Sequence, residues 1–454
     1  MAPSAISPIP DYKLSLQDLK SVDQSLGAAQ NPCLHHGVAQ SLSKQLIANA
    51  LKARVDAVDP DTCDPGDDDA FFVADLGEVY RQHLRWKKNL ARVKPHYAVK
   101  CNPDPRVIHL MKELGLGFDC ASMNEIETVL NMGVDPSRII YAQPCKTKAY
   151  VRYAARAGVK QMTFDNQDEL YKVKQLSPDA ELYLRIMTDD SASLCQLSNK
   201  FGASTNDTGD LLELARKLSL NVVGVAFHVG SGASDPSAFI KAVQDARFVF
   251  DQAEALGFTM HTLDVGGGFT GDASFEAMAA VLSSALDDYF PPSIRVIGEP
   301  GRYYVATAFT IACSIIGRRT VNDATLGTTS YMLYMNDGVY GNFSCIPFDH
   351  QKPTPRVLKC ASDPVNTFLY DSHVSGYDTP GMTEYSIWGP TCDGIDKIPD
   401  THCFQQVINV GDWLYFEDMG AYTKCSATPF NGFPAAHDTV YVCSEPGAAA
   451  LLDL

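Results

Sequence analysis

The chain has no excess of positive charge: 54 acidic residues outnumber 37 lysines and arginines, and the net charge of the 454 residues is −17. This balance argues against nucleic acid and against an anionic membrane surface as binding partners. No apolar run approaches the roughly 20 residues of a membrane-spanning helix. The start, MAPSAISPIPDYK, lacks the basic and then apolar regions of a secretory signal. We therefore expect a soluble protein of the cytoplasm that binds neither nucleic acid nor membrane.

The thirteen cysteines lack the patterns of a disulfide framework or of a metal site. Their number is odd, they are scattered, and they include no C-x-x-C pair and no Cys/His cluster at zinc spacing. Reduced thiols are the expected state, and no metal is predicted. Hydrophobic residues make up 45% of the chain and charged residues 20%, values typical of a globular protein with a substantial core.

What the sequence does contain, between residues 97 and 298, is a regular alternation of short apolar runs with segments of helical spacing. This alternation predicts a parallel sheet with helical crossovers, and eight units is the number that closes a (β/α)8 barrel. A doubly wound open sheet is the alternative that periodicity alone leaves open. The predicted strands span residues 97–99, 117–121, 139–142, 161–164, 181–186, 222–228, 262–265 and 295–298.

The two ends of the chain have a different texture. After about residue 308, short alternating or aromatic runs punctuated by glycine and proline predict an all-β domain. Upstream, we predict a helix over 38–58, a strand over 70–76 and a helix over 77–93 that stops before Pro95. The polar segment 352–382 is typical of a mobile loop. The predicted units are a poorly ordered tail (1–35), a segment contributing to the β domain (36–75), the barrel (76–308), the β domain (309–445) and a tail (446–454).

The first predicted barrel strand ends in a lysine, Lys100, within the stretch HYAVKCN, and Asn102-Pro103 stops the strand there. A lysine beside a buried strand is costly unless its amine has a chemical role, and imine formation is the usual one. A lysine that points into solvent is the alternative. Barrel enzymes carry their chemistry at the C-terminal strand ends, which favours the chemical interpretation.

The last strands end in residues that suit a phosphate. Glycines 266–268 follow the seventh strand and Gly301-Arg302 follows the eighth, so open backbone N–H groups and a fixed positive charge are available to an anion. With Lys100 they fit pyridoxal phosphate, whose aldehyde would bind the lysine and whose pyridine nitrogen would be kept protonated by Glu299. His228 would contact the ring. Taken singly, the glycines are typical of a turn and His228 of a satisfied core residue.

Ten motifs together closely resemble the eukaryotic ornithine decarboxylases, particularly the fungal ones. They cover roughly residues 70–443 in the family's order: HYAVKCN, GFDCAS, FHVGSG, DVGGGF, GEPGRYYV, NDGVYGNFSC, FDH, WGPTCDGID, MGAYT and FNGF. The resemblance implies an alanine-racemase-like barrel (fold type III) with a C-terminal β domain, pyridoxal phosphate as cofactor and a homodimer with shared active sites. It also implies decarboxylation of L-ornithine to putrescine and CO2, the first step of polyamine biosynthesis, and it admits an antizyme as a regulatory partner.

The resemblance assigns the cofactor residues by position. Lys100 would form the imine with the cofactor, Glu299 would pair with the pyridine nitrogen and His228 would stack on the ring. Asp119 and Arg185 would lie beside the cofactor. The phosphate would be held by Ser231, Gly266, Gly267, Gly268, Gly301, Arg302 and Tyr422.

The same resemblance assigns the substrate and the dimer residues. Cys392 would return a proton to Cα after CO2 leaves, while Asp349 and Asp393 would bind the distal ammonium of ornithine. Cys392 and Asp393 would come from the partner subunit. The implied interface residues are Lys200 and Asp396, which would bridge the subunits, and the aromatic residues Tyr340, Phe348 and Phe430.

Three alternatives stay open at this point. Without the resemblance, Asp393 is typical of a turn and Cys392 is one more thiol. Pro347 stands where the family has leucine and Gln143 where it has asparagine, and a paralogue acting on lysine or on an ornithine-like precursor would carry the same motifs. An inactive regulator of the antizyme-inhibitor type would have lost cofactor residues, all of which are present here.

Overall fold

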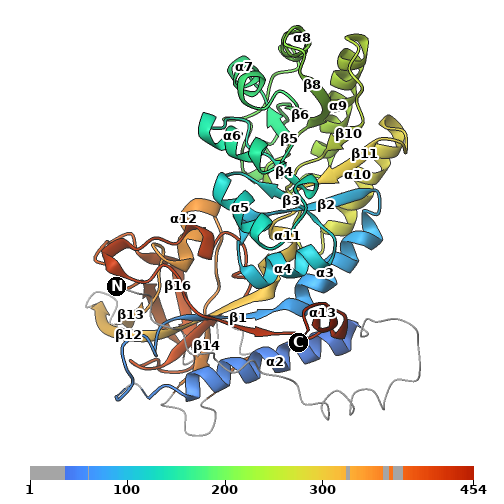
Figure 1. Ribbon diagram of the computed structural model, residues 1–454. Helices are drawn as coiled ribbons and strands as arrows, with labels where there is room; N and C mark the ends of the chain where they lie inside the picture. The colour runs from blue at the N-terminus through green and yellow to red at the C-terminus, as the bar shows by residue number, and fades with distance from the viewer. Residues whose placement is uncertain (1–35, 60, 324–327, 361–367, 372–381, 454) are drawn as a thin grey trace, which may run out of the picture.

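A computed structural model describes residues 36–59, 61–323, 328–360, 368–371 and 382–453. The predicted tail 1–35 lies outside the described residues, as do 361–367 and 372–381 of the predicted loop 352–382. The loop prediction is wrong over Arg356–Lys359, which form strand β14, and the predicted tail 446–454 is wrong over Pro446–Leu451, which form helix α13. The chain forms a barrel and a β domain that lie side by side, with the barrel at the upper right of Figure 1 and the β domain at the lower left.

Eight parallel strands close the barrel in the order β10-β11-β2-β3-β4-β5-β6-β8, which confirms the predicted (β/α)8 architecture and excludes the open sheet. Helices surround it in alternation with the strands (Figure 1). The strands are β2 (Val93–Ala98), β3 (Gly117–Cys120), β4 (Ile139–Tyr141), β5 (Gln161–Phe164), β6 (Glu181–Arg185), β8 (Asn221–Ala226), β10 (Thr262–Asp264) and β11 (Arg295–Gly298). The helices are α3 (Leu76–Asn89), α4 (Pro105–Glu113), α5 (Met123–Asn131), α6 (Lys148–Arg156), α7 (Gln167–Leu176), α8 (Thr208–Lys217), α9 (Ser237–Ala255) and α10 (Phe275–Tyr289).

The first barrel strand begins earlier than the sequence predicts. Helix α3 ends at Asn89, and β2 begins at Val93, so the predicted helix over 77–93 is wrong at its C-terminal end. Pro95 lies inside β2, where its register partner is Gly298. The indole N–H of Trp86 donates to the Val93 carbonyl at 2.8 Å and fixes the turn between the helix and the strand.

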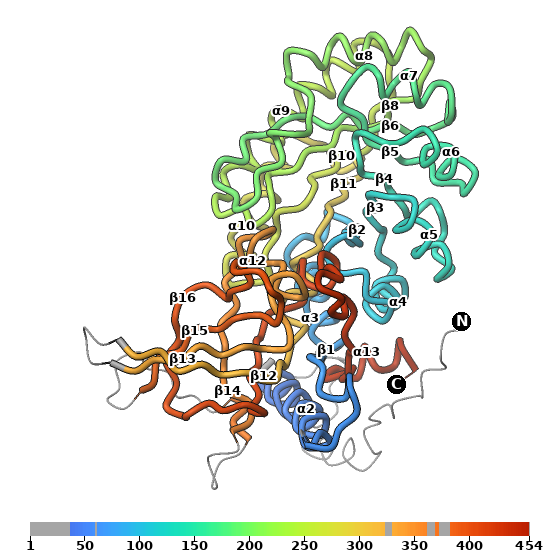
Figure 2. The backbone as a smooth tube through the Cα atoms, turned by 90° about the vertical axis from the view of Figure 1, so that its left-hand side faces the viewer, coloured from blue at the N-terminus to red at the C-terminus, as the bar shows by residue number. Residues whose placement is uncertain are grey.

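The β domain is a mixed eight-stranded sheet with the order β14-β17-β12-β13-β15-β16, to which β1 and β18 are joined through β12. Helix α2 (His36–Asp56) runs along its outer face (Figures 1 and 2) and packs Leu51 and Val55 against Phe71 and Val73 of β1. The strands are β1 (Phe71–Asp75), β12 (Phe309–Asp323), β13 (Thr328–Met335), β14 (Arg356–Lys359), β15 (Thr383–Trp388), β16 (Lys397–Phe404), β17 (Trp413–Phe416) and β18 (Thr439–Val442).

Short elements join the two units around the barrel mouth. Helix α11 (Arg302–Val305) follows β11 and leads directly into β12, and α12 (Cys345–Asp349) lies between the units in Figure 1. The Tyr422 N–H donates to the Cys101 carbonyl at 3.0 Å, and the Asn102 amide donates to the Gly420 carbonyl at 2.8 Å. The β domain is thus bonded to the residues that flank Lys100. No described helix has the length and the apolar character needed to span a membrane.

Candidate active site

Lys100 leaves the barrel wall in a single 3-10 turn, η1 (Val99–Cys101), directly after β2. Its Nζ contacts Oδ2 of the fully buried Asp119 on β3, and 40% of its own side chain remains exposed at the mouth. Withdrawal from water alone would lower the pKa of Lys100, but the carboxylates of Asp119 and Glu299 outweigh it and raise that pKa. The amine is therefore held as an ammonium beside a group that can take its proton.

Two buried carboxyl groups lie together on the far side of this lysine. Glu299, after β11, is 8% exposed, and Asp264, the last residue of β10, is 1% exposed. Burial, with the charges of Asp119 and Asp264 close by, raises the pKa of Glu299 well above its ordinary value, and burial also raises the pKa of Asp264. The pair can hold a proton at neutral pH. Sequence reasoning missed Asp264, although it stands in the quoted motif DVGGGF.

His228 follows β8 and lies beside the glycine-rich turn. Its Nδ1 accepts a hydrogen bond from the Gly230 N–H at 3.0 Å. Burial, together with Arg185 and Lys100, lowers the pKa of His228 well below its ordinary value, so the ring is neutral. Gly267 keeps the space beside the ring open, because a Cβ there would stand 2.8 Å from His228 Nε2. A neutral, flat side chain next to an open backbone suits a stacked aromatic ligand.

Arg302 begins α11 and faces the same mouth. Its Nη2 donates to Ser231 Oγ at 3.1 Å and to Asp349 Oδ1 at 2.6 Å, and its guanidinium lies 4.9 Å from the centre of the Tyr422 ring. The predicted phosphate residues Arg302, Ser231 and Tyr422 are thus brought together. Asp349, predicted to bind the distal ammonium, is buried against the arginine, and its other oxygen accepts from the Gln351 amide.

The residues of the mouth fit pyridoxal phosphate. Asp119 Oδ1 and Asp264 Oδ2 are buried and have no hydrogen-bond partner among the described residues. Gly266 has a φ of 63°, and a Cβ there would stand 2.1 Å from the Phe227 carbonyl oxygen. Gly268 has a φ of 99°, and a Cβ there would stand 2.7 Å from the Gly230 carbonyl oxygen. An amine, an aromatic contact, a protonatable carboxyl pair, a tight glycine turn and a guanidinium are the donor set that this cofactor requires.

Cys392 and Asp393 lie in a separate place, on the loop between β15 and β16. The Cys392 thiol is exposed, and its N–H donates to Asn431 Oδ1 at 2.9 Å. The half-buried Asp393 accepts from the hydroxyl of Tyr340, whose ring stacks on Phe430 at 4.3 Å between centroids. Within the described part of the chain, the hydrogen bonds of both residues go to the β domain and not to the barrel mouth.

The remaining predicted interface residues are of two kinds. Phe348 is 67% exposed, and Lys200 is an exposed cation over the ring of Phe201 at 5.0 Å. Asp396, predicted to bridge the subunits, is 1% exposed and accepts hydrogen bonds within its own chain from Val339 and Thr391. These hydrogen bonds hold in place the loop that carries Cys392.

Comparison with known proteins agrees with this site. Residues 76–306 match the family described as "Pyridoxal-dependent decarboxylase, pyridoxal binding domain", which confirms the predicted cofactor. Ornithine decarboxylase of Neurospora crassa is 60% identical over 470 aligned positions, which cover 98% of this chain and 96% of that protein. Antizyme inhibitor 2 of Xenopus laevis is 49% identical, over 81% of this chain and 79% of that protein.

Among solved structures, the arginine decarboxylase of Paramecium bursaria Chlorella virus superposes with a TM-score of 0.77 at 33% identity. The superposition covers 88% of this chain and 100% of that one. It confirms the predicted fold class, a barrel with a C-terminal β domain of the alanine-racemase type. The chain belongs to the pyridoxal-dependent decarboxylases and, among them, to the ornithine decarboxylase family.

Proposed function

We propose that this protein is a cytoplasmic carboxy-lyase that converts L-ornithine to putrescine and CO2, the first step of polyamine biosynthesis. The observation that carries the proposal is the grouping of Lys100, Glu299 and Arg302 at one barrel mouth. Lys100 contacts the carboxylate of Asp119, the pKa of Glu299 is raised so that it can hold a proton, and Arg302 donates to Ser231. The chemistry that pyridoxal phosphate supplies when bound is an electron sink for the bond to the departing carboxylate.

The barrel residues would hold the cofactor and manage the protons around it. Lys100 would bind its aldehyde, and Asp119, in contact with Nζ, would take the proton that the ammonium must lose first. Glu299, backed by Asp264, would keep a proton at the ring nitrogen, and the neutral His228 would stack on the ring. The phosphate would lie against Arg302, Ser231, Tyr422, Gly301 and the turn Gly266, Gly267, Gly268, and Arg185 would lie beside the cofactor.

The second half of the site would come from a partner subunit in a homodimer. Cys392 would donate a proton to Cα, and Asp393 would bind the distal ammonium together with Asp349. Support comes from exposed apolar side chains beside the proposed substrate residues. Phe348, next to Asp349, is 67% exposed, Ile395, two residues after Asp393, is 68% exposed, and Phe430, stacked on Tyr340, is 41% exposed. Large exposed apolar side chains are typical of a protein interface. Lys200 would add to the contact at its rim, whereas the buried Asp396 would act on the interface only through the loop that it holds.

Release of CO2 from ornithine, lysine and arginine, compared at equal concentrations, tests the substrate. Ornithine is expected to react fastest, since the terminal ammonium must reach two carboxylates at a fixed distance. One methylene is worth only roughly 1–3 kcal/mol, so the lysine comparison is the sensitive one. A clear preference for lysine would replace the proposed substrate. The relatives include an antizyme inhibitor, and a purified protein without imine absorbance after addition of pyridoxal phosphate would favour such a regulator.

Subunit mixing tests the shared sites. Lys100→Ala and Cys392→Ala homodimers are each expected to be nearly inactive. Mixed together, they form hybrid dimers in which one site combines an intact Lys100 with an intact Cys392. Partial recovery of activity is expected, and no recovery would refute the sharing of residues between subunits.

A further inference from the structure

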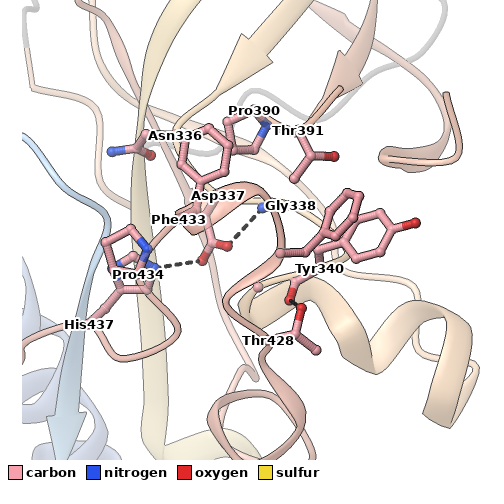
Figure 3. Close-up of a pocket in the computed structure, with 12 residues that line it drawn as sticks. Asn336, Asp337, Gly338, Tyr340, Pro390, Thr391, Thr428, Phe433, Pro434 and His437 are labelled. Carbon is pink, nitrogen blue, oxygen red and sulfur yellow. Dashed lines mark hydrogen bonds and ion pairs between the residues drawn. The ribbon is translucent and has the colours of Figure 1, made fainter. Parts of the chain in front are cut away.

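A small pocket in the β domain is lined in part by Pro390 and Thr391 (Figure 3), the two residues that precede Cys392 and Asp393 in the chain. Three segments meet there: the turn after β13, the loop after β15 and the segment before β18. Its lining includes Asp337, Gly338, Tyr340, Thr391, Thr428 and His437. The histidine and the aspartate at its base have no part in the mechanism proposed above.

His437 and Asp337 form a buried pair at the base of this pocket (Figure 3). Their side chains are 4% and 3% exposed, and Nε2 stands 3.5 Å from Oδ2. The same carboxylate accepts from the Gly338 N–H at 2.8 Å and from the Asn342 N–H and amide at 3.1 and 2.8 Å. The position of Asp337 therefore fixes the whole turn, and His437 is the cationic side chain paired with it.

Asp396 joins this turn to the loop of Cys392. One carboxylate oxygen accepts from the Val339 N–H at 2.8 Å, and the other accepts from the N–H and hydroxyl of Thr391 at 3.0 and 2.6 Å. The Asp396 carboxylate is packed tightly between the two segments, because a Cβ at either Gly338 or Gly389 would stand 2.2 Å from Asp396 Oδ1. A shift of the turn must therefore move Thr391, the residue before Cys392.

The third segment, which precedes β18 and contains His437, is hydrogen-bonded to both the turn and the Cys392 loop. The Thr428 N–H donates to the Tyr340 carbonyl at 2.8 Å, and Asn431 accepts from the Cys392 N–H at 2.9 Å. This segment then leads into His437. The loop with the two proposed catalytic-site residues is thus fastened on both sides to segments that the His437–Asp337 pair holds together.

Several charges face His437. Burial, the largest influence, and the ammonium of Lys424 lower its pKa, whereas Asp337 and Asp69 raise it, and the net effect is a pKa above the ordinary value. Lys424 is itself directed toward Asp104, at 3.4 Å. A histidine with a raised pKa keeps its ion pair to a higher pH than an ordinary histidine and loses it as the pH rises through that pKa.

We propose that the His437–Asp337 ion pair positions the Cys392–Asp393 loop for the partner subunit's active site, so that proton loss from His437 as the pH rises loosens this half of the site. His437 is a positioning residue and touches neither substrate nor cofactor. The inference rests on the proposed function, because only a shared site makes the position of this loop visible in catalysis.

Hybrid dimers test the inference, with His437→Gln as the probe because glutamine keeps a donor but no charge. The reference hybrid combines Lys100→Ala with Cys392→Ala subunits, and its one complete site takes the loop from the Lys100→Ala subunit. In one arm His437→Gln is added to that loop-donating subunit. In the other arm it is added to the Cys392→Ala subunit, which donates only the lysine. His402→Gln, at another histidine of the same domain that is 9% exposed, is placed on the loop donor as a further control.

On the loop donor, His437→Gln is expected to lower kcat/KM about tenfold at pH 6, where even a histidine of ordinary pKa is mostly charged, which is about the size of one lost interaction with a buried carboxylate. On the lysine donor it leaves the hybrid at the reference rate, as does His402→Gln. The difference between the two arms shrinks as the pH rises, because His437 of the reference then loses its proton as well. The pH trend is a response that a purely structural histidine would not give.

The outcomes separate the two proposals. An inactive reference hybrid refutes shared sites and, with them, the role of His437. An active reference hybrid with equal losses in both arms shows a general effect on folding and overturns the positioning role. An active reference with no loss in the loop-donor arm, or with a loss that does not change with pH, overturns it too.

Discussion

Gly267→Ala measures how closely the cofactor ring is expected to fit against the glycine turn. The new methyl group would stand 2.8 Å from His228 Nε2 and 3.0 Å from the Glu299 carbonyl oxygen, both inside normal contact distance. The φ of Gly267 is not in the left-handed region, so the change acts through crowding alone. Overpacking of this kind costs about 1–3 kcal/mol, and a loss of that size corresponds to roughly 5- to 150-fold weaker binding of pyridoxal phosphate.

The assay is titration of the apoenzyme with pyridoxal phosphate, followed by the visible absorbance of the bound imine, beside urea unfolding of the same sample. Gly209→Ala, in helix α8, is the control, because the nearest atom to the new methyl group is Gln252 Nε2 at 3.9 Å, an ordinary contact distance. It should leave the affinity unchanged and stabilise the fold by about 0.5–1 kcal/mol. Unchanged affinity in Gly267→Ala would refute the proposed stacking of the cofactor ring on His228 beside this turn.

Three further predictions concern stability and the substrate. Burial lowers the pKa of His96 to about 3, so as the pH falls this imidazole is protonated in the unfolded chain before it is protonated in the folded one. Below the ordinary histidine pKa, acid should therefore reduce the free energy of unfolding by about 1.4 kcal/mol per pH unit. A His96→Gln variant should show a flatter acid limb in urea unfolding. Glu169→Gln should cost about 3–5 kcal/mol in urea unfolding, because it leaves the fully buried Lys146 without its carboxylate; a Lys146→Met/Glu169→Gln double variant should lose less. Tyr340→Phe removes the hydroxyl that donates to Asp393 and should raise KM for ornithine about threefold, with cofactor affinity unchanged.

The barrel could be predicted because its period is long and regular. Each of the eight predicted strands overlaps an observed one, and residues 161–164 and 295–298 agree at both ends. The start of β2 could not be predicted, because proline usually ends an element and its effect depends on what lies opposite. Pro95 is accommodated in the strand with Gly298 as its partner in the register.

The barrel half of the site follows from topology once the strands are known. In a closed parallel barrel the C-terminal strand ends meet at one mouth, which is why Lys100, Asp119 and His228 converge although 128 residues separate the first from the last. Asp264 was overlooked because a carboxylate before glycines is also a common turn signal. Its burial beside Glu299, which gives it a proton to share, is a property of packing and not of the motif.

The β-domain half of the site depends on loops, whose sequences have no hydrophobic periodicity from which their conformation could be predicted. Asp349 illustrates the difference: the resemblance gives it the substrate ammonium, whereas its Oδ1 lies 2.6 Å from Arg302. Since that guanidinium cancels its charge, Asp349 offers little net attraction to a cation. Asp393 is bonded to a neutral phenol, which lowers its pKa and leaves its negative charge uncompensated. The net charge for an ammonium would therefore come mainly from Asp393, which supports the proposal that the substrate site needs a second subunit.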